Sequence, residues 1–475
     1  MLDKALTSTG LFSTLPTTVA VSEAEYEALD YCQKEARFGF GSEPPAWSTT
    51  VILMKLAAGN PAVLHLLLAA LLAEIAWLVP TRQAMLSRAS DHYQLGLQLL
   101  MAVMKDMEAD PLVVVSCFWF LHLHQRRGLA MQHISNRELS TLMSDYLRSA
   151  QFFRQLSLSN AEHNAGYGGE GNSTLSPETH AILARLAIWL FWVDTRSCLL
   201  GSGEMARLIS RAMTPIGFFG MYEASKGALR LHWSSMYPDH ELADEFRIAS
   251  ALELVHYTWI VVQEINEALL TGSMSSERSR QISGMLDALR WKGHINSVFQ
   301  LTESPMTVRD RLLANADWGV ASFHAARIYN FRCSLAEEAM MFSSYRSGDI
   351  TGTVDALLLL AQRTLATNDR EQLGKMQWPL VWAGTETTDP FKQNWILSRL
   401  NHPLAHDVLQ AILVEQSGGT GAHMARIAEI CRARCAMVPW IEEDGAFGRQ
   451  FPTELQGKDK ASAEASVGLS FIGAG

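Results

Sequence analysis

The sequence contains few cysteines and no closely spaced pair of them. Such wide spacing fits a reducing compartment better than the disulfide framework of a small secreted protein. Structural zinc sites need ligands brought together by short spacings such as CxxC, and none occurs here. The shortest interval, Cys431 to Cys435, has no second pair beside it. We therefore predict no metal ligands and no cofactor-binding residues. The six cysteines are Cys32, Cys117, Cys198, Cys333, Cys431 and Cys435.

The sequence also lacks a basic excess, a secretory signal and a clear membrane span. Its formal net charge is −10, whereas proteins that bind duplex DNA unaided present basic surfaces. The first 30 residues show no charged segment followed by an apolar one, which disfavours a secretory signal. The most apolar run, residues 63–79, is near the lower length limit for a span and contains His65 and Glu74. We expect this run to be a buried core helix and the chain not to enter a membrane.

Motifs of common catalytic sites are absent as well. No GxSxG, HExxH or DDxxD pattern occurs. The glycine-rich stretches at 166–171 and 201–203 lack the strand and the lysine of nucleotide-binding loops. The glutamates at 337–338 are adjacent rather than facing, and His122 and His124 point in different directions on a helix. We predict no catalytic residues and no enzymatic activity, with a helical enzyme as the weakest alternative.

What the sequence does contain is apolar residues at helical spacing. It is 48% hydrophobic, which suffices for a sizeable core. Alternating strand patterns are almost absent, and even the β-branched run at 112–121 has helical neighbours. We therefore predict an all-α fold, a large multi-helix domain with no significant β-sheet. In the clearest helix, residues 243–270, one face carries Ile248, Leu252, Val255, Trp259 and Val262.

Composition divides the chain into three parts. Residues 1–60, with glycines and prolines at 39–45, indicate a partly irregular, loosely packed arm. Residues 61–440 form the helical domain, in which 213–240 are expected to be irregular. Residues 441–475 are small and polar, which predicts a disordered tail. Its acidic start beside Trp440 is compatible with a transactivation segment, but a solvated linker is the simpler interpretation.

Two segments carry a resemblance to a known family. Residues 183–203 form an aromatic-rich helix that ends in an aspartate and a small-residue turn, with Trp189, Phe191, Trp192, Asp194 and Gly201. Residues 376–389 read MQWPLVWAGTETTD, with Trp378, Pro379, Ala383, Gly384 and Glu386. A helix should begin near Pro379 or bend there. Together these segments resemble the fungal-specific transcription factor domain, the regulatory domain of zinc-cluster transcription factors.

The resemblance covers residues 60–440 and implies an all-α regulatory domain. It also implies a nuclear protein that controls RNA polymerase II genes, often those of secondary metabolism. No stretch of the sequence matches the zinc cluster, so we expect a regulator or co-regulator that acts through a DNA-binding protein partner. A zinc cluster encoded upstream, or a domain diverted to another role, would equally account for the missing match. The sequence contains 13 tryptophans and 20 methionines, side chains that can line an apolar pocket. A metabolite-sensing module therefore remains an alternative, as does regulation by a small-molecule effector. Homodimerisation also stays open.

Overall fold

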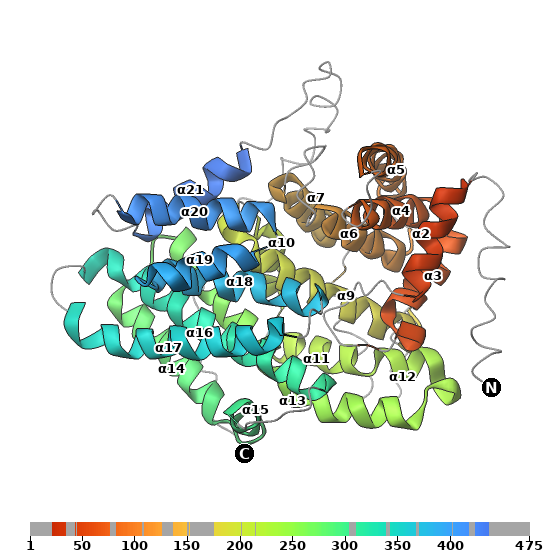
Figure 1. The fold of residues 1–475 in the computed structure, drawn as a ribbon. Helices are drawn as coiled ribbons and strands as arrows, with labels where there is room; N and C mark the ends of the chain where they lie inside the picture. Colours follow the sequence, from red (N-terminus) through yellow and green to blue (C-terminus); the bar gives the residue numbers. More distant parts are fainter. Residues whose placement is uncertain are drawn as a thin grey trace, which may run out of the picture. The chain divides into compact units, whose positions relative to one another are not determined.

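The prediction of an all-α fold is confirmed. In its described ranges, the computed structural model contains 19 α-helices, three short 3-10 helices and no β-strand (Figure 1). These ranges belong to one unit, residues 1–439, and the expected tail at 441–475 lies outside them. The structure describes residues 21–34, 43, 45–76, 82–106, 109–125, 136–149, 152, 175–200, 202–213, 215–303, 310–338, 343–366, 370–400, 402–417 and 423–436.

The N-terminal helices are built around one buried helix, α4 (Pro61–Ile75). Asn60 caps it, because its Oδ1 accepts hydrogen bonds from the amides of Ala62 and Val63 at 3.0 and 3.3 Å. Twelve of its 15 residues are buried, so residues 63–75 of the apolar run belong to a core helix, as expected. Within the described ranges, no helix is both long and apolar enough to span a bilayer. Packed on α4 are α2 (Glu23–Lys34), α3 (Thr49–Gly59), α5 (Arg82–Val103) and α6 (Pro111–Gln125), and α6 also contacts α7 (Asn136–Ser149).

The described residues before α4, which are 21–34, 43 and 45–60, include two packed helices in the region where a loosely packed arm was expected. α2 buries Ala28, Leu29 and Cys32, and α3 follows the short 3-10 helix η2 (Pro45–Trp47) with its own buried side chains. Both helices pack against core elements rather than standing apart. The glycines and prolines at 39–45 lie between the two helices, so they separate two packed elements. Each helix is too short for its apolar spacing to stand out in the sequence.

The expectation that residues 213–240 are irregular is wrong. They form α11 (Pro215–Lys226), α12 (Ala228–Trp233) and the 3-10 helix η4 (Ser234–Met236). Pro215 occupies the first position of α11, where a missing backbone N–H costs no hydrogen bond. Burial of Met221 and Tyr222 against the core compensates for the low helix propensity of the glycines.

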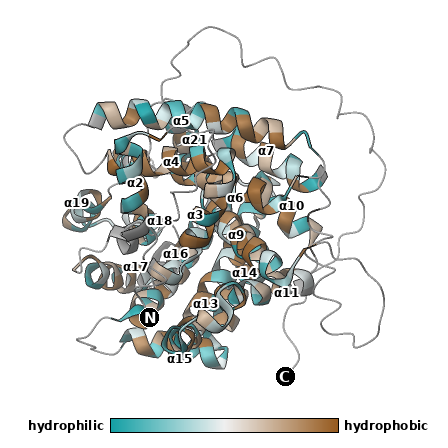
Figure 2. Ribbon diagram, turned by 90° about the vertical axis from the view of Figure 1, so that its right-hand side faces the viewer, coloured by the Kyte–Doolittle hydropathy of each residue, from teal (hydrophilic) through white to brown (hydrophobic). Residues whose placement is uncertain are grey.

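Two long helices, α13 (Asp239–Leu270) and α16 (Arg311–Glu338), pack against each other and organise the rest of the chain. Four of the five apolar residues predicted for one face of α13 are buried, and Leu252 is partly buried. At Gly319 of α16, a Cβ atom would lie 3.2 Å from the carbonyl oxygen of Ala251, so glycine permits this close approach. Figure 2 shows the apolar character of the central helix α6.

The remaining helices surround this pair. α9 (Pro177–Arg196) contacts α6, α11 and α13, and α18 (Arg370–Glu386) contacts α16, α17 and α20. The other elements are η3 (Cys198–Leu200), α10 (Glu204–Ala212), α14 (Ser276–Trp291), α15 (Gly293–Glu303), α17 (Ser343–Leu365), α19 (Pro390–Arg399), α20 (Pro403–Ser417) and α21 (Met424–Ala436).

Candidate functional site

Asp194, in the first motif segment, is buried in the last turn of α9. Its carboxylate accepts hydrogen bonds from the amides of Gly203 and Ala206 at 3.0 and 2.8 Å. Desolvation raises the pKa of Asp194, while these bonds and one from Ser140 oppose the rise. Gly203 has φ +102°, a conformation that favours glycine, and precedes α10. Asp194 therefore caps the first turn of α10.

Ser140 of α7 completes the same cap. Its Oγ accepts hydrogen bonds from the amides of Glu204 and Met205 at 3.0 and 3.3 Å. The first turn of a helix leaves such amides without helical partners. Two side chains from α9 and α7 thus bind four consecutive amides at the start of α10. Sequence reasoning missed Ser140, because a serine inside a helix gives no local signal of a distant role.

Replacing Ser140 with alanine is expected to lower the free energy of unfolding by about 1–2 kcal/mol. The loss leaves two amides of α10 without an acceptor and removes a donor to Asp194. Urea unfolding followed by circular dichroism measures it. The control is Ser398→Ala, because that exposed hydroxyl only bonds the carbonyl of Trp395 in its own helix; it should change stability by less than about 0.5 kcal/mol. Equal effects of the two substitutions would contradict the cap.

The aromatic residues of the first motif contact side chains of three neighbouring helices. Trp189 packs on Trp119 of α6 at 5.2 Å between ring centroids, and Phe191 packs on Phe218 of α11 at 4.9 Å. Trp192 donates a hydrogen bond from Nε1 to His256 Nδ1 of α13 at 3.3 Å. His256 also stacks on Tyr222, with 4.2 Å between ring centroids. Burial lowers the pKa of His256 to about 3, so its ring is neutral.

Residues 376–386 of the second motif segment lie within α18, and residues 387–389 follow it. Trp382 stacks on Tyr329 of α16 at 4.4 Å, and Trp378 packs on Trp259 of α13 at 4.8 Å. α18 begins well before Pro379, so the helix does not start at the proline, which was one of the two possibilities that the sequence allowed.

Gly384 of α18 permits a second close approach of helices. A Cβ atom at this position would lie 2.6 Å from Leu409 Cδ2 of α20. Gly384→Ala is therefore expected to cost about 1–3 kcal/mol through overpacking, measured as a lower urea midpoint. The matched control is Gly284→Ala in α14, where no atom lies within 4 Å of the added Cβ. That control should be neutral or stabilising by up to about 1 kcal/mol; the same sign for both variants would contradict the prediction.

Glu386, the last residue of the second motif, is held at the C-terminal end of α18. It forms a buried ion pair with Arg332 of α16. Arg332 Nη2 also donates to the carbonyl oxygen of Thr385 at 3.2 Å, and Gln416 of α20 donates to the same oxygen at 2.9 Å. Desolvation raises the pKa of Glu386, and the Arg332 guanidinium opposes the rise. The ion pair and the hydrogen bond from Gln416 together connect α16, α18 and α20.

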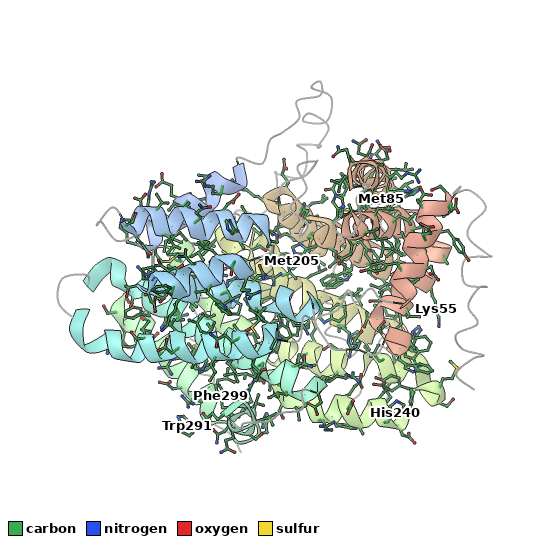
Figure 3. All side chains as sticks on the ribbon, in the orientation of Figure 1. Lys55, Met85, Met205, His240, Trp291 and Phe299 are labelled. Carbon is green, nitrogen blue, oxygen red and sulfur yellow. The ribbon has the colours of Figure 1, made fainter. Side chains whose placement is uncertain are left out.

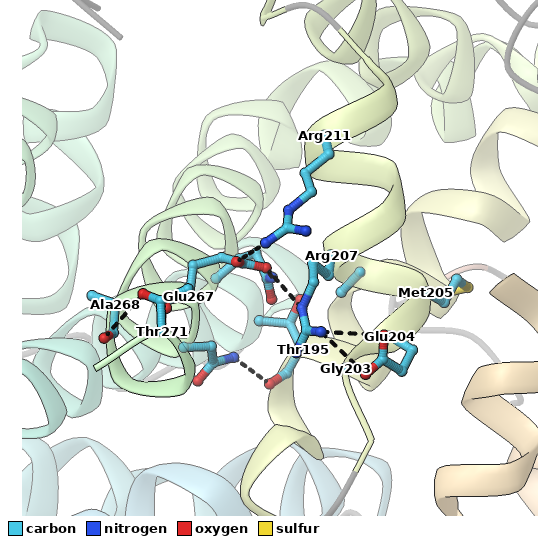
Figure 4. Close-up of polar contacts among 12 residues, drawn as sticks. Thr195, Gly203, Glu204, Met205, Arg207, Arg211, Glu267, Ala268 and Thr271 are labelled. Carbon is cyan, nitrogen blue, oxygen red and sulfur yellow. Dashed lines mark hydrogen bonds and ion pairs between the residues drawn. The ribbon is translucent and has the colours of Figure 1, made fainter. Parts of the chain in front are cut away.

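Two residues outside the motifs connect the two segments. Asn266 of α13 donates from Nδ2 to the carbonyl oxygen of Thr195 at 2.9 Å, next to Asp194 (Figure 4). Its Oδ1 accepts a hydrogen bond from the Tyr329 hydroxyl at 2.9 Å, and the Tyr329 ring stacks on Trp382. Segments far apart in the sequence thus meet through one side chain of α13 and one of α16. We call this chain of contacts the motif joint.

A half-exposed ion network lies beside the motif joint. Glu267 of α13 pairs with Arg207 and Arg211 of α10 at 3.2 and 3.0 Å, and Arg207 also pairs with Glu204 (Figure 4). Ion pairs this exposed contribute little stability each. Their consequence is to fix the orientation of α10 on α13, next to the cap made by Asp194.

The other candidate residues from the sequence do not converge. His122 and His124 are buried in α6, where His124 Nδ1 lies 3.2 Å from the carbonyl oxygen of Ala69. Cys431 is buried in α21. Among the described residues, no three His, Cys, Asp or Glu side chains are placed to hold a metal ion. Outside the described residues lie Gly201, residues 166–171, the acidic residues after Trp440 and the side chains of Cys435, Glu337 and Glu338.

A small cavity lies between α6, α7, α9 and α10. Its volume is about 10 Å³, and its lining includes Met205 of α10, the residue labelled in Figure 3. Pockets for small molecules measure roughly 300–1,000 Å³, so this cavity gives no support to the metabolite-sensing alternative. Its lining is apolar and consists of Val115, Phe118, Met143, Leu147, Phe152, Ala187, Leu190, Met205 and Ile209.

Comparison of the chain with protein-family models, with curated proteins and with solved structures gives no match. The functional assignment therefore rests on the residues of this chain. Their arrangement has a clear physical character: buried carboxylates cap or pair with neighbouring helices, and the tryptophans pack against other rings. Such groups hold helices in place.

Proposed function

We propose that this chain is the helical body of a transcriptional regulator or co-regulator of RNA polymerase II genes that acts through protein partners. The observation that supports it best is the motif joint. In the two segments that it connects, residues that resemble the fungal-specific transcription factor domain have structural roles: Asp194 caps α10, Gly384 allows α20 to pack closely on α18, and Glu386 pairs with Arg332. These are roles that a regulatory body requires of its motifs.

Charge supports a partner-dependent mode of action. A net charge of −10 repels the phosphate backbone, so protein contacts are the more favourable route to a promoter. The partner in this proposal is a DNA-bound transcription factor, and the site of action is the nucleus. A role in a secondary-metabolite gene cluster follows from the resemblance.

Selection from a random duplex pool with the purified full chain, at about 150 mM salt, tests the proposal. We expect no enriched sequence. The positive control is the same chain fused to a zinc-cluster module, which should enrich the site of that module. Enrichment of a defined sequence by the unfused chain, with nanomolar affinity, would contradict action through partners.

A further inference from the structure

A glutamate and two histidines connect α2, α5 and α4. His65 Nδ1 of α4 lies 2.7 Å from His92 Nδ1 of α5. His92 Nε2 lies 3.1 Å from Glu25 Oε1 of α2. The backbone amide of Ser22 donates to Glu25 Oε2 at 2.6 Å, and Arg88 of α5 donates to Ser22 Oγ at 2.9 Å. These polar contacts therefore connect the start of α2 to α4 and α5.

The distance between the two rings allows only one hydrogen between them. A neutral imidazole carries one N–H, and two N–H groups facing each other at 2.7 Å would repel. In the neutral pair, His92 donates to Glu25 from Nε2 and accepts from His65 at Nδ1. After uptake of one proton, His92 donates at both nitrogens and His65 accepts at Nδ1, carrying its own hydrogen on Nε2. A second proton has no place in this geometry.

The groups around the pair have opposing effects on its protonation. Burial and the nearby His92 lower the pKa of His65 to about 4, against the opposing effect of Glu25. Desolvation raises the pKa of Glu25, but the hydrogen bonds from Ser22 and His92 outweigh it, so this pKa falls below its ordinary value. Glu25 on α2 is thus an anion facing His92. The positive charge of Arg88 on α5 meets α2 at Ser22.

We propose that Glu25, His92 and His65 form a clasp that binds one proton and fastens α2 to α4 and α5. The clasp is tightest when the histidine pair holds one added proton, because His92 is then a cation bound to the Glu25 anion rather than a neutral donor to it. It opens when a second proton reaches His65, because two cationic rings would then face each other. The position of α2 consequently depends on pH.

Backbone amide exchange of the full chain between pH 4 and pH 8, corrected for the chemical exchange rate, tests the clasp. Protection of α2 relative to α13 should be greatest near pH 5–6 and fall about tenfold by pH 4. The His92→Gln variant should lose this maximum. His294→Gln is the matched control, since it removes another His–Glu pair of 3.0 Å; its α2 profile should equal that of the wild type.

Exchange of the histidine C2 hydrogens, followed by mass spectrometry on the wild type, provides a second readout that needs no variant. His65 should stay neutral until the pH falls to about 4. The proposal is overturned if both rings titrate together above pH 6. It is also overturned if the protection of α2 parallels that of α13 at every pH.

Discussion

Replacing Arg332 with methionine is expected to lower the free energy of unfolding by about 3–5 kcal/mol. Glu386 is nearly inaccessible to solvent and pairs with Arg332. Without the guanidinium, a carboxylate remains buried without a countercharge, and desolvation of Glu386 is already the main influence on its pKa. The variant also removes a donor to the carbonyl oxygen of Thr385. Urea unfolding at pH 7.5 measures the loss.

Two controls separate this pair from other ion pairs. The double variant Arg332→Met with Glu386→Leu removes both charges and should recover most of the loss. Arg426→Met removes more exposed ion pairs with Glu415 and Glu429 and should cost much less than the Arg332 variant, because exposed pairs contribute little stability. A single Arg332 variant that costs no more than the Arg426 variant would contradict a role for this pair at the motif joint.

The second large effect is loss of stability in acid through His256. Its pKa falls from an ordinary 6.5 to about 3 in the folded chain because burial disfavours the charged ring. Below pH 6.5, His256 binds a proton in the unfolded chain but stays neutral in the folded chain. The contribution is therefore complete above pH 6.5 and is lost as the pH falls toward 3. From pH 7.5 to pH 5, His256 alone should remove about 2 kcal/mol from the free energy of unfolding.

The difference between the wild type and His256→Gln isolates this effect. Glutamine has no titratable proton and keeps an acceptor for Trp192, so the variant should lose about 2 kcal/mol less than the wild type over the same pH range. Urea midpoints at pH 7.5 and pH 5 provide the comparison, with the exposed His294→Gln as control. Parallel pH profiles of the wild type and His256→Gln would show that His256 is not kept neutral by burial.

Long helices were predictable because their evidence is local. The apolar spacing in α13 marks its buried face, and the Asn60–Pro61 pair marks the start of α4. Asp194 and Glu386 were found through a resemblance, but their roles were not. Capping of α10 and pairing with Arg332 depend on residues that are distant in the sequence. Sequence spacing carries no information about such contacts.

The contacts of the two residues that connect the motif segments were even less predictable from the sequence. Asn266 and Tyr329 are single polar groups within long helices, and nothing in the sequence relates them to each other or to Thr195. The helices at 215–233 were missed for a different reason. Glycine and proline lower helix propensity there, and tertiary burial overrides that preference. Packing between distant segments determines both the contacts of Asn266 and Tyr329 and the helical structure at 215–233.

Chromatin occupancy is the most direct test of the proposed partner-dependent role. The tagged full chain would be mapped on chromatin in its native cells before and after rapid depletion of the zinc-cluster factors that co-purify with it. The proposal predicts that promoter occupancy disappears once those factors are removed, while the level of the chain itself is unchanged. Occupancy that persists at the same promoters after their removal would contradict it.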